Sequence, residues 1–276
     1  MALAPEQTQI SVTVAESNSE AGCLLTSMGA RVLTAPVTVR VEAVTKEGQK
    51  MTLEPNMTNT LVLPESAADV QTKHLAGVMI DPVTKRIYPV PTTFAVENGK
   101  HTAILPTHGN MIYMVIENEK EFSDVPEGHY AKESIDTLAS KLIVTGDSSD
   151  SFAPNRSISR AEFAALLTRA LGIVPQADSG ASFSDVATDY VHAEAIQAAA
   201  KAGLINGYND GTFKPNAQVS REEMAQMMFN AMKFSGRVQT DGISAAEKTQ
   251  LFARFADNNQ ISDGQVTQPP LSSKRE

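Results

Sequence analysis

Two short segments of the sequence share a pattern that could bind an anion. Residues 158–162 read Ile-Ser-Arg-Ala-Glu, and residues 219–223 read Val-Ser-Arg-Glu-Glu. The Ser-x-x-Glu spacing is typical of a capping box. In that motif the serine hydroxyl accepts a hydrogen bond from the backbone N–H three residues on, and the glutamate carboxylate accepts one from the serine's own N–H. Each segment therefore predicts the start of a helix.

An arginine follows the serine in both segments, at Arg160 and Arg221. The N-terminus of a helix is locally positive, so a cation there costs about 0.3 to 1 kcal/mol. Free N–H groups beside a guanidinium fork can, however, bind a carboxylate or a phosphate. We therefore expect both segments to recognise an anion. The predicted ligand-binding residues are Ser159, Arg160, Glu162, Ser220, Arg221 and Glu223.

The two segments belong to a longer internal repeat. Phe122 and Phe183, Gly146 and Gly207, and Arg160 and Arg221 are among the identical pairs that lie 61 positions apart (183 − 122 = 61; 221 − 160 = 61). A fixed period of this kind indicates repeated supersecondary units. We place repeat 1 at residues 122–173 and repeat 2 at residues 183–234.

Each repeat is expected to contain two helices joined by a loop with a phenylalanine plug. The apolar spacing of the second helix begins at Phe163 in repeat 1 and at Met224 in repeat 2. The first helix of repeat 1, near residues 131–141, should turn Ile135 and Leu138 inward. A unit of about 50 residues is too small to bury both of its helices well, so the repeats should pack together.

Residues 1–116 indicate a different architecture. Apolar and polar residues alternate around Val12, Val39 and Val115, which is typical of strands with one buried face. Asn98-Gly99 predicts a type I′ hairpin turn, and Asp81-Pro82 predicts a second turn. The fold class expected for the whole chain is α+β and multidomain, with a β-sandwich-like module followed by α-helical repeats.

Residues 117–121 form a short charged link between the two parts. At the other end, Phe255-Ala-Asp257 resembles the opening of a third repeat, but Pro269 and Pro270 fall where its first helix should run. We therefore interpret residues 255–276 as a remnant of a third repeat with an irregular tail. A missing third unit would leave apolar surface exposed.

Composition narrows the range of functions. The 276 residues carry a formal net charge of -9, which argues against non-specific binding to nucleic acid. No apolar run approaches 18 residues, so no membrane span is expected, and residues 1–9 show no signal peptide. The single cysteine, Cys23, excludes an intrachain disulfide and is expected to be buried. Neither a metal nor another cofactor is predicted.

No catalytic pattern stands out, since the sequence has no G-x-S-x-G, H-E-x-x-H or P-loop, and we expect no enzymatic activity. The segment Asn206 to Gly211 is similar to a calcium loop, but Tyr208 occupies a ligand position and Ala217 stands where glutamate is needed, which favours a turn. Paired helices could also indicate helix-turn-helix DNA binding, but the net negative charge of the chain argues against it.

The motifs of the repeat resemble those of the S-layer homology (SLH) family. They are Phe-Ser-Asp-Val, Gly-Tyr-Asn-Asp-Gly-Thr-Phe-Lys-Pro from Gly207 to Pro215, and the two Ser-Arg segments, where the family has Thr-Arg-Ala-Glu. The resemblance implies three repeats packed as a three-pronged bundle, here incomplete, and an arginine that meets the acidic group of a ligand. Glu222 departs from the family's alanine and adds a negative charge beside the second segment.

The resemblance also implies a function and a location. An exported protein would be held non-covalently to the bacterial cell wall, outside the cell, by binding secondary cell-wall polysaccharide that carries an acidic, often pyruvylated, sugar. The alternative is an assembly module of a surface lattice, in which the repeats contact other copies of the chain and the arginines make salt bridges.

Overall fold

The computed structural model describes residues 8–16, 20–45, 49–53, 57–67, 69–175 and 183–238. It divides into two compact units, Met1–Asn155 and Arg156–Glu276. The division runs through the first repeat, between its two helices. The predicted remnant of a third repeat at residues 255–276 lies outside the described residues.

Unit 1 contains the strands, and most of the predicted strands are present. Ten strands are described: β1 (Thr8–Glu16), β2 (Arg31–Val32), β3 (Val37–Thr45), β4 (Lys50–Thr52), β5 (Thr58–Val62), β6 (Leu75–Ile80), β7 (Ile87–Val90), β8 (Thr93–Glu97), β9 (Lys100–Pro106) and β10 (Met111–Glu117). The helices described in this unit are α1 (Glu20–Ser27), α2 (Lys132–Ser140) and two 3-10 turns, η2 (Glu65–Ala67) and η3 (Thr72–His74).

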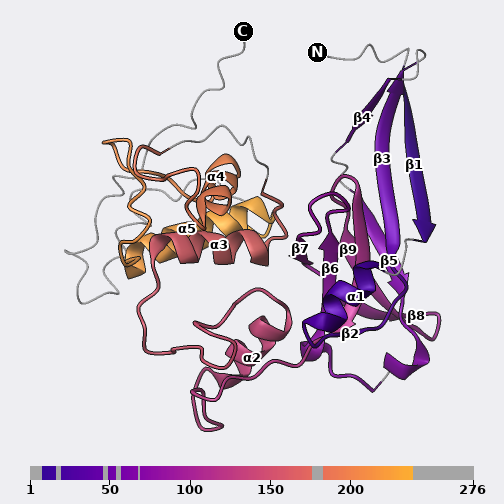
Figure 1. The fold of residues 1–276 in the computed structure, drawn as a ribbon, viewed down its shortest axis with the longest axis horizontal. Coiled ribbons are helices and arrows are strands. Elements are labelled where there is room, and N and C mark those ends of the chain that lie inside the picture. The colour runs from indigo at the N-terminus through magenta and orange to yellow at the C-terminus, as the bar shows by residue number, and fades with distance from the viewer. Residues whose placement is uncertain are drawn as a thin grey trace. The chain divides into compact units, whose positions relative to one another are not determined.

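The strands form two antiparallel sheets (Figure 1). The larger has the order β1-β3-β10-β6-β7, with β2 on β10 and β4 on β3, and the smaller has the order β5-β9-β8. The sheets face each other closely at Gly77, where an added Cβ would lie 2.5 Å from a methyl group of Leu105. On its other face, the larger sheet packs against Leu25 of α1. The interior therefore has the sandwich character expected for residues 1–116.

Both predicted turns are confirmed. Asn98 and Gly99 have φ angles of 50° and 75° and connect β8 to β9, as a type I′ turn requires. The Asp81 carboxylate accepts hydrogen bonds from the N–H groups of Val83 and Thr84 at 2.7 and 3.2 Å, which closes the turn between β6 and β7. These backbone hydrogen bonds offset the effect of burial and lower the pKa of Asp81.

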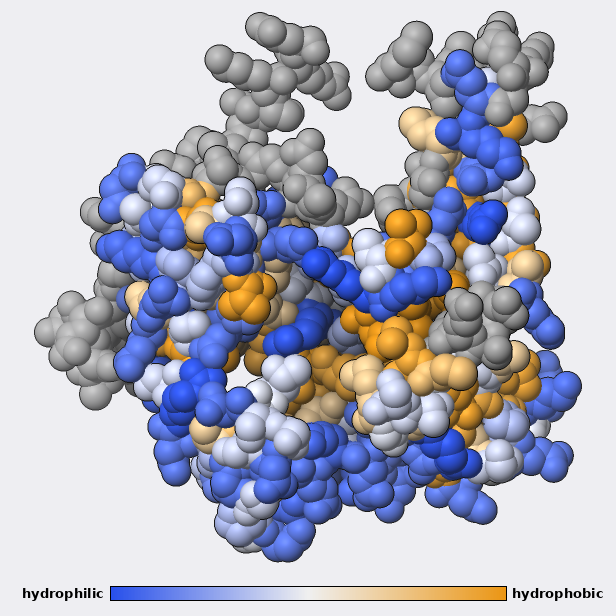
Figure 2. Space-filling view, viewed as in Figure 1, coloured by the Kyte–Doolittle hydropathy of each residue, from blue (hydrophilic) through white to orange (hydrophobic). Residues whose placement is uncertain are grey.

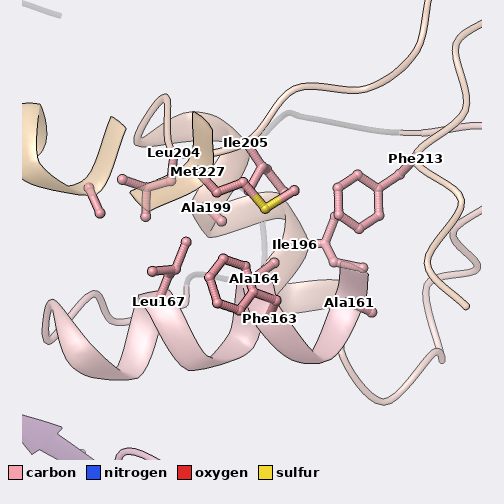
Figure 3. Close-up of a cluster of buried hydrophobic side chains, with 11 residues drawn as sticks. Ala161, Phe163, Ala164, Leu167, Ile196, Ala199, Leu204, Ile205, Phe213 and Met227 are labelled. Carbon is pink, nitrogen blue, oxygen red and sulfur yellow. The ribbon is translucent and has the colours of Figure 1, made fainter. Parts of the chain in front are cut away.

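Unit 2 contains α3 (Arg160–Ala170), α4 (Ala193–Lys201) and α5 (Arg221–Phe234). The three helices share one core, in which Phe163 and Leu167 of α3 meet Ile196 of α4 and Met227 of α5 (Figure 3). Phe213, from the loop before α5, is also fully buried in it. The second helix of repeat 1 thus completes the core of repeat 2. The first helix of repeat 1, α2, instead contacts η3 and the strands of unit 1.

The prediction that the chain continues as helix-rich repeats in an incomplete three-pronged bundle is wrong. In the part of the chain that is described, the structure is mostly β, with two antiparallel sheets, and is 26% helical. The reason is that the helices of the repeats are short, with 9 residues in α2 and 11 in α3, and long irregular loops occupy the rest of each period. The module before the repeats contributes the strands that outweigh them.

Two smaller expectations also failed. Leu138 was expected to point inward but is 36% exposed, whereas Ile135 and Ala139 on the same helix are buried. Cys23 is exposed rather than buried, because the helix α1 that carries it packs on the sheet through Leu25 instead. In Figure 2, unit 1 shows a broad hydrophobic area on the face in view, and unit 2 is mostly hydrophilic there.

Candidate functional site

Both predicted capping boxes are confirmed. At the start of α3 the N–H of Glu162 donates to the Ser159 hydroxyl at 3.2 Å, and the N–H of Ser159 donates to the Glu162 carboxylate at 2.8 Å. At the start of α5, Glu223 and Ser220 make the same pair of bonds at 3.2 and 2.9 Å. The local sequence thus fixes both helix starts in the same way.

Each loop before a capping box is held by an aspartate from the Phe-Ser-Asp-Val motif. Asp124 accepts from the N–H groups of Phe152 and Ala153 at 2.8 and 2.7 Å, and Asp185 accepts from those of Phe213 and Lys214, both at 2.7 Å. The bond from Phe152 is the main cause of a lowered pKa at Asp124. The aspartate carboxylates therefore serve to order the loops.

A glycine opens each of these loops because a side chain would not fit. An added Cβ at Gly146 would lie 2.4 Å from the carbonyl oxygen of Ser151, and one at Gly207 would lie 2.5 Å from the Phe183 ring. In each repeat the loop phenylalanine packs against an earlier phenylalanine ring, Phe152 against Phe122 and Phe213 against Phe183. The ring centroids are 5.3 Å apart in both pairs. The two loops therefore have the same internal design.

The arginines of the two motifs differ sharply in their surroundings. Arg160 is only 4% exposed, and its guanidinium bonds to three groups of repeat 2. Nε donates to the carbonyl of Phe213 at 2.8 Å, one terminal nitrogen to the Glu223 carboxylate at 2.7 Å, and the other to the carbonyl of Asn206 at 3.2 Å. The guanidinium also lies over the rings of Tyr208 and Phe213, at 4.8 and 4.7 Å from their centroids. We call this set of contacts the Arg160 clamp.

The backbone at the start of α3 is occupied as well. The N–H groups of Arg160 and Ala161 donate to the carbonyls of Ala217 and Pro215 at 2.9 and 3.1 Å. Together with the capping bond to Ser159, these contacts use the N–H groups that an anion would otherwise bind. At the first motif, repeat 2 itself occupies the groups that sequence reasoning assigned to a ligand.

Arg221 lies on the surface at the first position of α5. Within the described residues its guanidinium makes no hydrogen bond or ion pair. Ser220 beside it is exposed, and Glu223 is half-buried and tied to the Arg160 clamp. The second motif therefore presents a solvent-facing guanidinium at a helix N-terminus, the arrangement predicted for anion recognition.

Glu223 connects the two motifs electrostatically. Burial by itself would raise the pKa of its carboxyl group. The hydrogen bond from Tyr208 at 2.6 Å, the Ser220 N–H and the charge of Arg160 outweigh burial and hold that pKa below its ordinary value. The carboxylate is therefore ionised at neutral pH and stabilises the clamp. The pKa of Tyr208 is raised, by burial first and by the bond to Glu223 second.

Sequence reasoning missed Arg156. This arginine pairs with Glu162, the capping glutamate of α3, just as Arg160 pairs with Glu223, the capping glutamate of α5. The Arg156 guanidinium makes two bonds to the Glu162 carboxylate, at 2.8 and 3.2 Å. These bonds are the main reason, ahead of the bonds to Ser159, that the pKa of Glu162 is lowered to about 2. The position 61 residues on is Ala217, so this arginine is not part of the repeat. The signal that could have revealed it is an arginine that lies close to the first motif and has no equivalent in repeat 2.

The described residues hold no group of three or more His, Cys, Asp or Glu side chains that could bind a metal ion. In the same part of the chain, none of the helices is both long enough and apolar enough to cross a membrane.

Comparison with known proteins matches the S-layer homology domain model to residues 121–164 and 182–225. An amylopullulanase of Thermoanaerobacterium thermosulfurigenes is 37% identical over 152 residues, which are 55% of this chain and 8% of that protein. An endo-1,4-beta-xylanase A of Thermoanaerobacterium saccharolyticum is 43% identical over 106 residues, or 38% of this chain and 9% of the relative. The surface-layer 125 kDa protein of Lysinibacillus sphaericus is 31% identical over 125 residues, which are 45% of this chain and 10% of that protein.

The chain thus spans about a tenth or less of the length of each of these three relatives. The matched segments contain both capping boxes and both aspartate-held loops. The chain therefore carries two domains of the S-layer homology family, at residues 121–164 and 182–225.

Proposed function

We propose that the chain holds an exported protein to the bacterial cell wall by binding secondary cell-wall polysaccharide at an acidic, for example pyruvylated, sugar. The two S-layer homology domains support a cell-wall anchoring role, and the similarity to a surface-layer protein supports a place at the cell surface. In this proposal the segment has no catalytic activity of its own, and any catalysis belongs to other parts of a longer protein.

The observation that carries the choice of ligand is the exposed guanidinium of Arg221 at the N-terminus of α5, which has no hydrogen-bond or ion-pair partner among the described residues. A guanidinium can donate two parallel hydrogen bonds to one carboxylate, and the helix dipole favours the same negative charge. Ser220 and Glu223 support the site by fixing where the helix begins. Lys214 is exposed and stands over the Tyr208 ring at 4.2 Å, which adds a second cation near this helix start.

The first motif acts indirectly in this proposal. Arg160, with Ser159 and Glu162 fixing the start of α3, holds the loop from Asn206 to Phe213 in place. Because Glu223 belongs both to that clamp and to the second capping box, losing Arg160 would disturb the second motif too. Arg221 is thus assigned the direct contact and Arg160 a positioning role.

The test is co-sedimentation of the chain with bacterial cell walls before and after acid extraction of the secondary polysaccharide. We expect binding only to the unextracted walls. Arg221→Gln should weaken binding roughly tenfold or more, because a charge-assisted hydrogen bond contributes about 1.5 to 3 kcal/mol. Arg237→Gln removes the same charge from an exposed site beyond α5 and should leave binding unchanged.

Equal binding to extracted walls would contradict the choice of polysaccharide as ligand. If Arg221→Gln changed the oligomeric mass of the chain and left wall binding intact, the lattice-assembly alternative would replace the anchoring proposal.

A further inference from the structure

The strand β1 forms an open edge of the larger sheet. Among the described residues it pairs only with β3, through nine consecutive antiparallel positions from Thr8 opposite Thr45 to Glu16 opposite Val37. In an antiparallel sheet, every second residue of an edge strand turns both its N–H and its C=O away from the neighbouring strand. The outer side of β1 therefore offers a row of backbone donors and acceptors that another strand can bind.

One face of β1 is apolar and uncovered. Ile10, Val12 and Val14 are 71%, 48% and 65% exposed. Their direct partners on β3 are Ala43, Val41 and Val39, which are at most 3% exposed. Directly paired residues lie on the same face of a sheet. The exposed apolar side chains of β1 therefore lie beside the buried apolar side chains of β3 on that face. In Figure 1, β1, β3 and β4 extend together from the rest of unit 1.

Edge strands of soluble proteins are usually blocked against pairing by a lysine, a proline, a bulge or a very short length. β1 has none of these devices: it is nine residues long, its register with β3 is unbroken, and its sequence contains neither lysine nor proline. Its one charged residue, Glu16, stands at the end of the strand. The strand is thus long, regular and unprotected.

The sequence of β1 is also complementary to itself. When two copies run antiparallel around Val12, each Ile10 lies opposite a Val14, each Ser11 opposite a Thr13, and the two Val12 residues oppose each other. The aliphatic residues then share one face and the hydroxyl residues the other. No like charges are brought opposite each other, because the only charged residue lies at the strand end.

We propose that two copies of this chain associate through β1, in antiparallel register about Val12, to form one continuous sheet around a twofold axis. The association satisfies the open backbone edges and brings six aliphatic side chains, three from each copy, side by side on one face of the sheet. The twofold arrangement closes on itself and produces a dimer instead of a fibre. This contact lies in the β module and is independent of the wall-binding site proposed at α5.

The first test is the molecular mass of the full chain, measured by light scattering over a range of concentrations. We expect twice the chain mass for the wild type. Val12→Lys should return the mass to that of one chain, because it sets two ammonium groups opposite each other at the twofold axis. The control, Val83→Lys, makes the same change at a valine that is 85% exposed in the turn after β6, and it should remain dimeric.

A second test fixes the register, with the exposed Cys23 replaced by serine in every variant. Val12→Cys should crosslink two chains on mild oxidation, because directly opposed Cα atoms lie about 4.5 to 5.5 Å apart, within the range of a disulfide. Ser11→Cys should not, because its two copies would be offset by two residues along the strands and lie roughly 8 Å apart.

A wild-type chain that is monomeric at all concentrations would overturn the proposal. So would a dimer that Val12→Lys leaves intact and that is lost on Met228→Lys, since Met228 is an exposed residue of α5 and the interface would then lie there. Equal crosslinking of Val12→Cys and Ser11→Cys would overturn the register.

Discussion

The helices α3 and α5 begin with the same capping box but lie in opposite surroundings. Arg160 is 4% exposed, and its equivalent Arg221 lies in solvent. Leu167 is 3% exposed and its equivalent Met228 is 45% exposed; Thr168 is 2% exposed and Phe229 is 38% exposed. The face of α3 that repeat 2 covers is thus the face that α5 presents to solvent.

The comparison shows that the motif determines the helix start and that packing determines the role of the arginine. In both copies the serine and glutamate make the same two bonds. In the first copy, carbonyls and a carboxylate of the following repeat surround the guanidinium, and the positive charge that a helix N-terminus disfavours is neutralised there. In the second copy the guanidinium is exposed and has no hydrogen-bond or ion-pair partner in the part of the chain that the structure describes.

The largest expected difference between the two copies is in stability. Arg160→Gln should lower the free energy of opening of unit 2 by about 3 kcal/mol, because the Glu223 carboxylate loses its charged partner and two carbonyls each lose a hydrogen bond. Arg221→Gln should change that free energy by less than about 0.5 kcal/mol, as is usual for an exposed site. Hydrogen exchange of the α3 and α5 amides, read by mass spectrometry in the full chain, measures both.

A double-mutant cycle sharpens this prediction. If the clamp is a coupled pair, Glu223→Gln added to Arg160→Gln should cost less than the sum of the two single changes. Equal losses for Arg160→Gln and Arg221→Gln would contradict the distinction between the two arginines.

A smaller difference is expected from the apolar residues on the same two helices. Leu167→Ala should destabilise unit 2 by about 2 to 3 kcal/mol, because it leaves a cavity in a core shared by three helices. Met228→Ala should cost under about 1 kcal/mol, since the side chain is already 45% exposed. The same hydrogen-exchange measurement applies, and a Met228 effect as large as that of Leu167 would mean that α5 is covered in solution.

Much of this comparison could be predicted from the sequence, and the reason is that it depends on local chemistry. The capping boxes, the Asn98-Gly99 turn and the strand alternation around Val12 and Val39 each reflect interactions within a few residues or one strand pair. The 61-residue period likewise located the helices of both repeats.

The remainder depends on which surfaces meet, which repeat spacing does not reveal. Nothing near Arg160 in the sequence indicates that its partners come from residues 206–223, and the same five-residue pattern leaves Arg221 exposed. The helix α1 went unpredicted because the alternation around it favoured strands throughout. The balance of strand and helix was misjudged because the long loops inside each repeat were counted with its helices.

The smallest expected effect concerns acid, and it separates the two capping glutamates. Glu162 has a pKa of about 2 in the folded chain, against 4.5 for an ordinary glutamate, chiefly because Arg156 donates to it. A lowered pKa stabilises the fold above the unfolded value, and this contribution is lost as the pH falls from about 5 towards 2. The Arg156 side chain is 47% exposed, so the pair should contribute only about 1 kcal/mol at neutral pH.

In the Arg156→Gln variant, the protection of the α3 amides against hydrogen exchange should therefore fall less between pH 6 and pH 3 than in the wild type. Hydrogen exchange measures this protection after correction for the intrinsic rate at each pH. Arg237→Gln removes an equal charge outside the repeats' helices and should keep the wild-type pH dependence. Arg156 has no equivalent in repeat 2, where Ala217 stands at its position. The capping glutamate of α5, Glu223, pairs with Arg160 instead. A pH dependence of α3 that Arg156→Gln leaves unchanged would show that another acid group governs the first repeat.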